Sequence, residues 1–534
     1  MKYTFSNKIL NLITAVIFGL IILFMVSMLL PAMGQPLTYT NIYMTANSAF
    51  FYVMFFLAWS CYLTSKYMLA GCDELCTKVY RYKSYNYVLV LEIVNTLATV
   101  IIFTIACIMS SLSPNFDYVY MVCLLKRVVL SFFLAATASI LLGLIIGSIR
   151  NKKAIIVVFL VTAIILSPVF ATMYNSADGK LIHILENLNL IQCNTYAMEY
   201  RFFLDSTPLY KWIKILGIIA ILLIPLIIKT TEKTKGRILI CSCFCLIFIG
   251  CEAYYYAPHS YFYESYYDNS FIEFYNNQSG DMEDIVDFTI SEYDLDIDFD
   301  EDMKCRCNLT LEGELKKAYT FTLYHTLKVT SVKSGDSDVK YSQAGDYLTI
   351  YDPKSSAITI DYKGIIDMYP ATKSLVYLPE FFPYYPIAGK KTVVSDDPAA
   401  AHVMNDFASN YKLSTNLKDL YTTNTNHKTK GIMILSANYE KKIVGDYTYI
   451  IPRYTSPAVT DQDLKDNNAL LDELLPSDYN KGSRIILIDK QYALTDHSYH
   501  IGDDILYMAG LPKQKITKEL LTTAIKERFE HAED

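Results

Sequence analysis

The chain has 534 residues, 52% hydrophobic and 19% charged, and its net charge of −7 is unevenly placed. Residues 1–252 hold 19 Lys and Arg against 10 Asp and Glu, whereas residues 253–534 hold 28 against 44. Most of the 12 cysteines lie in or beside apolar segments, which excludes a disulfide-stapled scaffold, and no nucleic-acid partner is expected of so acidic an outer half.

Seven apolar runs in the first half are long enough to cross a lipid bilayer, because a span needs about 20 residues at about 1.5 Å each. They cover residues 9–33, 46–70, 88–112, 128–149, 154–173, 212–228 and 238–256. We therefore expect a membrane α-helical bundle of about seven transmembrane helices over residues 1–256. The first run is too long for the apolar core of a signal peptide, so we expect a retained helix.

The short loops indicate the orientation of these helices. Loops 71–87, 150–153 and 229–237 are basic and alternate with loops 34–45 and 113–117, which carry no Lys or Arg. The positive-inside rule places the N-terminus in the cytoplasm and everything after residue 256 outside the plasma membrane. Lys126 and Arg127 lie just before the fourth span. We expect a partly exposed turn from Tyr118 there, with both side chains extending to the membrane surface. We expect residues 181–191 to form a helix that lies at the outer membrane surface.

This layout resembles the permease of type-2 ABC exporters. The resemblance covers roughly residues 1–230 and includes the polar loop after the second span, where Asp73, Glu74, Tyr82 and Lys83 resemble that family's cytoplasmic elbow. It implies that this elbow docks on a separate ABC-type ATPase subunit and that two permease protomers, equal or different, work together. The chain has no phosphate-binding loop of its own, since the stretch from Gly389 to Thr392 lacks the glycine that such a loop needs five residues earlier.

The second half begins with a strand pattern. Tyr293, Leu295, Ile297 and Phe299 alternate with four aspartates, a period of two that predicts a strand with one apolar face. The aspartates invite a calcium interpretation, but the glycine and the terminal glutamate of a calcium-binding loop are missing, so we expect a solvated face. Further strands are predicted at 305–311, 319–323, 327–332, 347–351 and 357–362, separated by turn residues, which together predict a β-sandwich. Cys305 and Cys307 share one side of a strand and are expected in its core.

The order of these strands resembles the N-terminal β-domain of the aminopeptidase N family of zinc metallopeptidases. Residues 291–364 match that domain's pattern, and Tyr377-Leu378-Pro379 with the run 382–386 resembles the segment that leads out of it. Permeases with such a peptidase fused after the last span are a known arrangement. The resemblance implies an extracellular mainly-β domain over 257–390 and, over 391–534, a smaller α/β remnant of the zinc peptidase domain.

The catalytic motif of that family is degenerate in this chain. An H-E-x-x-H helix provides two zinc ligands and a general base, but the corresponding helix, 516–531, reads Lys526-Glu527-Arg528-Phe529-Glu530, and the G-x-M-E-N segment is missing. Because a protonated ammonium cannot bind zinc, we expect a pseudo-peptidase without cofactor or metal. Glu527 is either a relic of the catalytic glutamate or an ordinary residue of a charged face. A second possible zinc site, His497 and His500 with Asp496 and Asp503, is more typical of surface loops.

The sequence thus predicts a membrane permease subunit of an ABC-type exporter with a non-catalytic extracellular domain that caps or binds cargo. Two alternatives stay open: a membrane-tethered, aminopeptidase-like metallopeptidase, possibly completed by a partner's zinc ligands, and an anchored binding or sensing module.

Overall fold

The computed structural model divides the chain into two compact units. One comprises Met1–Tyr200 with Leu204–Ala257, here called the helical unit, and the other comprises Arg201–Phe203 with Pro258–Asp534, here called the β unit. The structure describes residues 8–29, 37, 49–69, 86–167, 209–230, 234–255, 274, 286–300, 302–366, 368–373, 375–393, 403–423, 425–437, 439–454, 459–476, 484–487, 499–502, 505–508, 511 and 515–530. The division after Ala257 lies beside the predicted join of the membrane and outer halves.

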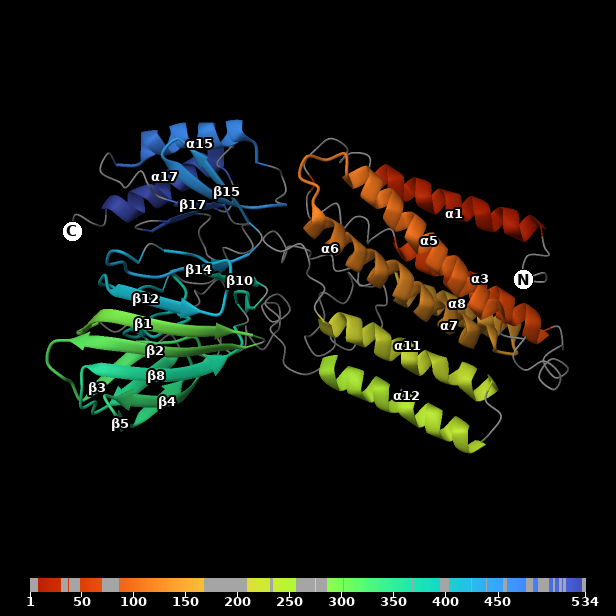
Figure 1. Ribbon diagram of the computed structural model, residues 1–534, viewed down its shortest axis with the longest axis horizontal. Helices are drawn as coiled ribbons and strands as arrows, with labels where there is room; N and C mark the ends of the chain where they lie inside the picture. Colours follow the sequence, from red (N-terminus) through yellow and green to blue (C-terminus); the bar gives the residue numbers. More distant parts are fainter. Residues whose placement is uncertain are drawn as a thin grey trace. The chain divides into compact units, whose positions relative to one another are not determined.

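Each of the seven apolar runs overlaps a helix of the helical unit (Figure 1). In chain order these are α1 (Lys8–Leu29), α3 (Ala49–Leu69), α5 (Asn86–Ser110), the continuous stretch α6 (Tyr118–Val128), η2 (Val129–Leu134) and α7 (Ala135–Gly147), then α8 (Lys152–Ile165), α11 (Leu209–Thr230) and α12 (Thr234–Tyr255). Among the described residues, three helices are long and apolar enough to cross a membrane: Tyr87–Ser110, Tyr118–Gly147 and Thr234–Tyr254. Seven crossings remain a prediction.

The helix containing Lys126 and Arg127 begins at Tyr118, where the sequence predicts an amphipathic turn. The carboxylate of Asp117 accepts a hydrogen bond of 2.8 Å from the backbone N–H of Tyr120, which satisfies an N–H that has no partner inside the helix. The helix then changes to one turn of π-helix, η2, before α7 continues it. Such π-helical turns are often found at functional sites.

Helices α3 and α7 pack closely because α7 presents glycines to α3. A Cβ atom added at Gly143 would lie 2.6 Å from the backbone oxygen of Leu57, and one at Gly147 would lie 2.6 Å from that of Cys61. The hydroxyl of Ser60 donates a 2.6 Å hydrogen bond to the carbonyl of Ile140 across the same contact. Small residues four positions apart are typical of helix pairs in membranes, where backbone proximity and interhelical hydrogen bonds drive association.

The β unit contains a sandwich of mainly antiparallel sheets, in which β12 and β1 form a parallel pair. Its six-stranded sheet has the order β12-β1-β2-β8-β4-β5, and a four-stranded sheet has the order β11-β3-β7-β6. The strands are β1 (Thr289–Phe299), β2 (Met303–Glu312), β3 (Ala318–Thr322), β4 (Lys328–Ser334), β5 (Ser337–Asp338), β6 (Tyr341–Ala344), β7 (Tyr347–Tyr351), β8 (Ala357–Gly364), β11 (Ile387–Ala388) and β12 (Asn410–Thr415). The strands predicted from alternation are therefore confirmed, with ends that differ by a few residues.

The core of this sandwich is formed by the residues that the alternation predicts. Tyr293, Leu295, Ile297 and Phe299 are buried, as are Cys305 and Cys307 from β2. The facing sheet contributes buried residues of β3 and β7 to the same cluster. A further four-stranded sheet of order β13-β14-β10-β9 adjoins it, formed by β9 (Ala371–Thr372), β10 (Leu375–Leu378), β13 (Tyr421–Thr422) and β14 (Ile434–Ser436).

The C-terminal part is an α/β sheet of order β15-β16-β17-β19-β18. Its strands are β15 (Tyr439–Val444), β16 (Tyr447–Pro452), β17 (Arg484–Leu487), β18 (Tyr499–Ile501) and β19 (Ile505–Met508), with helices α15 (Asp461–Leu474) and α17 (Lys515–Glu530). Leu464 and Leu471 of α15 and Leu521 and Ile525 of α17 are buried in a cluster with side chains of this sheet. Ile450, Ile505 and Tyr507 belong instead to the sandwich core.

Strands on both sides of residue 390, the predicted division, pair within the same sheets. Strand β12 pairs in parallel with β1, and β14 pairs with β10, so residues after 391 complete the sandwich and its neighbouring sheet. The separate α/β cluster begins only near β15. The sequence missed this because pairing between distant strands leaves no mark in local alternation. The interfacial helix predicted at 181–191 lies outside the described residues.

Candidate functional site

A buried carboxylate lies where the sandwich meets the C-terminal sheet. Glu380 follows β10 and sits in an aromatic run whose side chains are in the sandwich core. Its side chain is 2% exposed. Since a carboxyl group is rarely buried without partners, the residues around Glu380 form a candidate site.

Two residues of the C-terminal sheet provide these surroundings. Nε2 of His500 on β18 lies 3.6 Å from Oε1 of Glu380, and the imidazole is 13% exposed. The backbone N–H of Glu380 donates to the hydroxyl oxygen of Tyr507 at 3.4 Å. His500 and Tyr507 are register partners on adjacent strands, which places both side chains on one face of the sheet.

Two glycines make room for Glu380. A Cβ atom at Gly502 would lie 1.9 Å from Oε1 of Glu380, and a Cβ at Gly431 would lie 2.6 Å from its backbone oxygen. Real Cβ atoms do not approach other atoms so closely, so any larger residue would displace the carboxylate or the backbone. The position of Glu380 is thus fixed by packing from β18 and from the segment before β14.

The electrostatics of this cluster keep its phenol neutral. Burial, followed by the charge of Glu380, raises the pKa of Tyr507 well above its ordinary value. The ring of Phe381 meets the imidazole of His500 edge-on, with centroids 4.7 Å apart. The imidazole of His500 lies beside the carboxyl group of Glu380, and the phenol of Tyr507 contacts the backbone N–H of Glu380, so the cluster links the segment after β10 to the C-terminal sheet.

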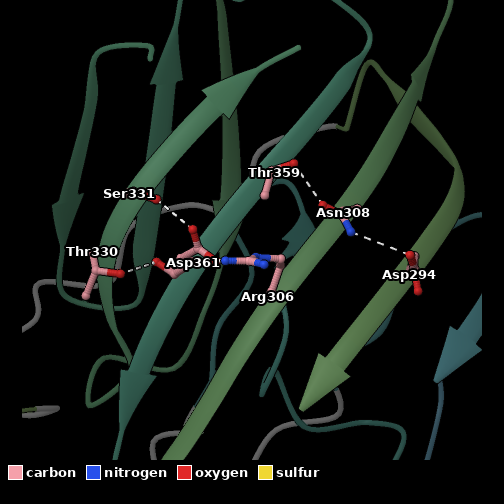
Figure 2. Close-up of polar contacts among 7 residues, drawn as sticks. All are labelled: Asp294, Arg306, Asn308, Thr330, Ser331, Thr359 and Asp361. Carbon is pink, nitrogen blue, oxygen red and sulfur yellow. Dashed lines mark hydrogen bonds and ion pairs between the residues drawn. The ribbon is translucent and has the colours of Figure 1, made fainter. Parts of the chain in front are cut away.

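A second polar site covers the outer face of the six-stranded sheet. Figure 2 shows Arg306 on β2 beside Asp361 on β8, with Nε of Arg306 2.9 Å from Oδ1 of Asp361. The hydroxyl of Ser331 donates to Oδ2 of Asp361 at 2.8 Å, and that of Thr330 donates to its backbone oxygen at 3.0 Å. Partial burial raises the pKa of Asp361, but the hydrogen bonds from Ser331 and Arg306 and the charge of Arg306 outweigh it and lower this pKa.

The predicted aspartate ladder lies on this same face. Asp296 and Asp298 are exposed and Asp294 is half-buried; Asn308 donates a 3.5 Å hydrogen bond to Asp294 and accepts one of 2.8 Å from Thr359 (Figure 2). By register, Asp296 is opposite Arg306 and Asp298 is opposite Lys304, so basic and amide groups of β2 face the carboxylates. Among the residues that the structure describes, no group of three His, Cys, Asp or Glu side chains is placed to hold a metal ion.

No protein-family model matches the chain, and a search of curated proteins finds no relative. Solved structures that match include a mutant M1 zinc metallopeptidase of Deinococcus radiodurans bound to a Tyr-Ser-Ala substrate, with 10% identity and a TM-score of 0.30, over 43% of this chain and 62% of that one. Leukotriene A4 hydrolase of Saccharomyces cerevisiae matches with 11% identity and a TM-score of 0.30, over 46% and 44% of the two chains. An aminopeptidase N family protein of Idiomarina loihiensis matches with 8% identity and a TM-score of 0.29, over 41% and 42%.

The present chain spans less than two thirds of the length of each of these structures.

Residues 526–530, the proposed remnant of the peptidase motif, lie on α17. Lys526 is exposed, whereas the preceding Ile525 is buried. The inward face of this part of α17 is therefore apolar. Glu527 and Glu530 lie on the same helix, and their side chains are outside the described part of the structure.

The other predicted site residues are divided between the two units. Of the proposed weak zinc site, His500 faces Glu380 in the interior, while His497, Asp496 and Asp503 lie outside the described residues. Asp73, Glu74, Tyr82 and Lys83 of the elbow also lie outside them. Glu380 was missed from sequence, although a lone carboxylate inside an aromatic run was a usable signal.

Proposed function

We propose that this protein is the membrane permease subunit of an ABC-type exporter, driven by a separate ATPase subunit, and that its β unit is a non-catalytic outer domain that caps or binds cargo. The proposal rests on the arrangement of basic loops between apolar runs, which resembles that family, and on the lack of a phosphate-binding loop in the chain. The proposed location is the plasma membrane, with the β unit outside.

The observation that carries the proposal is the construction of the helical unit. A tether for an outer domain needs one spanning helix, but three described helices are each long and apolar enough to span. They belong to a unit with a packed interior, in which Gly143 and Gly147 of α7 contact the backbone of α3. A packed, multi-helix unit is what a transport path between protomers requires.

The outer domain is proposed to be non-catalytic because of α17. An ammonium at position 526 cannot ligate zinc while protonated, and Lys526 is exposed to solvent. The β unit would then act by binding. ATP binding on the partner would press on the elbow, residues 71–87, tilt the helices and open a path for cargo that the β unit receives or retains.

The test is recovery of the partner. Full-length protein purified in mild detergent from the cells that produce it should carry an ATPase subunit. Reversing the charges of the elbow with Asp73→Lys and Glu74→Lys should lower that recovery, whereas reversing Asp338 and Asp466, which are exposed in the β unit, should not. If both double variants recover as much ATPase subunit as the unchanged protein, the elbow is not the docking site. If no preparation contains an ATPase subunit, the proposed permease function is wrong.

A membrane-tethered metallopeptidase is the second candidate, favoured by the helix α17 at the place of the peptidase motif. It requires about one zinc per chain and a chelator-sensitive peptidase activity that Glu527→Gln abolishes. The permease proposal expects neither zinc nor cleavage of aminoacyl reporters by the full-length protein, and no change on Glu527→Gln.

A further inference from the structure

Helix α5 holds a single charged residue, Glu92, among apolar neighbours. Leu89 and Ile93, on either side of it, are exposed apolar residues of the kind that face lipid. Glu92 itself is half-buried. Ionisable residues within membrane helices are rare and usually functional, and neither the elbow nor the β unit accounts for this one.

The carboxyl group of Glu92 belongs to a hydrogen-bonded cluster that joins three helices. Its Oε2 accepts a 3.0 Å hydrogen bond from the hydroxyl of Thr137 on α7 and a 3.4 Å one from the amide of Asn95. The same amide nitrogen of Asn95, which is buried, lies 3.1 Å from the carbonyl oxygen of Phe133. Oδ1 of Asn95 accepts from the hydroxyl of Tyr52 on α3 at 2.8 Å.

This cluster is attached to the π-helical turn. Phe133 lies in η2, and a π-helix leaves its backbone carbonyls with altered partners. In a membrane such carbonyls need polar partners from neighbouring helices, and Asn95 supplies one to Phe133. A change in the protonation of Glu92 would therefore affect Asn95 and Thr137, and through them the π-helical segment η2.

Glu92 lies within the apolar span of its own helix, five residues, or about 7.5 Å, after its first residue Tyr87. Its partner Thr137 lies ten residues before Gly147, the last residue of the apolar helix Tyr118–Gly147. An ionised carboxylate inside a hydrocarbon core is disfavoured unless it is paired.

No cation pairs with Glu92 among the described residues. The elements packed against α5 are α1, α3, α6, η2 and α7, and the titratable side chain that they bring to the cluster is Tyr52. Arg127 precedes Thr137 by ten residues on the same continuous helix, about 15 Å along its axis. Lys66 lies two residues beyond Thr64, whose hydroxyl contacts that of Tyr87 at the start of α5, but in the described part of the structure it forms no ion pair with Glu92.

A bound metal cation does not fit the hydrogen bonding. Oε2 of Glu92 faces an N–H and an O–H donor, and Oδ1 of Asn95 faces the hydroxyl of Tyr52. Oε2 of Glu92 and Oδ1 of Asn95 thus accept hydrogen bonds and are not available to a cation. Oε1 of Glu92 has no hydrogen bond among the described contacts. The ligand that suits Oε1 is a proton.

We propose that Glu92 is a proton-binding site in the membrane, protonated on Oε1 at neutral pH, and that loss of this proton disturbs the cluster that holds η2. The inference goes beyond the proposed function and needs no ATPase, so its failure leaves the permease proposal standing. It requires only that the helical unit lies in a bilayer.

The test is modification by dicyclohexylcarbodiimide, an apolar reagent that reacts with protonated carboxyl groups. The acid proton moves to a nitrogen of the reagent as the carboxyl oxygen bonds to its central carbon, and the O-acylisourea rearranges to a stable N-acylurea with no leaving group. Full-length protein in liposomes, treated between about pH 6 and about pH 9 and digested, should show the adduct on the peptide that contains Glu92, at a yield that falls as pH rises. Glu92→Gln should remove it.

A second variant tests whether the reaction depends on protonation of Glu92 or only on access of the reagent to its carboxyl group. Thr137→Val removes a donor that favours the ionised form, so modification should persist to higher pH, whereas Thr104→Val, an exposed position on α5, should leave the profile unchanged. The proposal is overturned if the wild-type peptide carries no adduct at about pH 6, or if a water-soluble carbodiimide modifies Glu92 equally well.

Discussion

Nε2 of His500 lies 3.6 Å from Oε1 of Glu380, and this contact joins the C-terminal sheet to the segment that leaves the sandwich. Both side chains are largely buried, and the lack of a side chain at Gly502 leaves room for the carboxyl group, since a Cβ there would lie 1.9 Å from Oε1 of Glu380. The α/β part is therefore held to the sandwich by a specific polar contact as well as by the shared apolar core.

Replacing His500 by Ala should strongly destabilise the β unit. The change leaves the carboxyl group of Glu380 buried without the imidazole, and a buried polar group that loses its partner costs about 1–3 kcal/mol. Denaturant unfolding of the full-length protein in detergent, followed by tyrosine fluorescence, measures the loss. His427→Ala is the matched control, since His427 is exposed and such a change usually stays within about 0.5 kcal/mol. Equal stability of the two variants would show that the contact is not structural.

A larger residue at Gly143 should separate α3 from α7. The side chain of Gly143→Ile would meet the backbone oxygen of Leu57, which lies 2.6 Å from the position of its Cβ, and overpacking of this kind costs about 1–3 kcal/mol or more. We expect lower yield and a lower melting temperature in detergent. Gly250→Ile, where nothing lies within 4 Å of an added Cβ, should be tolerated. If the Gly143→Ile and Gly250→Ile variants have the same melting temperature, the close packing of α3 on α7 is wrong.

The outer face of the sandwich should contribute to stability only above acid pH. The pKa of Asp361 is lowered in the folded protein, so its contribution is present above its unfolded pKa of about 4 and is lost as pH falls through the folded value. Asp361→Asn should therefore cost about 0.2–1 kcal/mol at neutral pH, because the pair with Arg306 is partly exposed. This difference should vanish towards about pH 2. If the stability difference between the wild-type protein and Asp361→Asn increases as the pH falls, the inferred direction of the pKa shift of Asp361 is wrong.

Labelling of introduced cysteines should establish the orientation of the chain. A cysteine placed within residues 270–290 should react with an impermeant reagent on intact cells, because the basic loops put this region outside. A cysteine within 229–236 should react only after permeabilisation. Reaction of both sites from the same side would contradict seven crossings.

The sandwich strands were predictable because burial on one face imposes a period of two, as Tyr293 to Phe299 show. The apolar helices were predictable because their length and hydropathy are local properties. The pairing of β12 with β1 was not, since no local pattern links residues so far apart in sequence. For the same reason the sequence assigned His500 to a surface loop, whereas the fold turns it toward Glu380.

The π-helical turn was also beyond the sequence. Residues 129–134 have the apolar composition of ordinary membrane helix, and the contact of the Asn95 amide with the carbonyl of Phe133 joins residues far apart in sequence. Glu92 could have been singled out as a lone carboxylate in an apolar run, but its partners Thr137 and Asn95 required the packing of α5 on α7.

ATP hydrolysis in liposomes tests the central claim most directly. The purified chain alone should hydrolyse no ATP, and the chain reconstituted with the ATPase recovered alongside it should hydrolyse ATP at a rate above that of the ATPase alone. The charge reversals at Asp73 and Glu74 should lower that stimulation. A recovered complex without ATP hydrolysis, or a protein that instead carries stoichiometric zinc and cleaves peptides, would contradict the assignment as an ATP-driven permease.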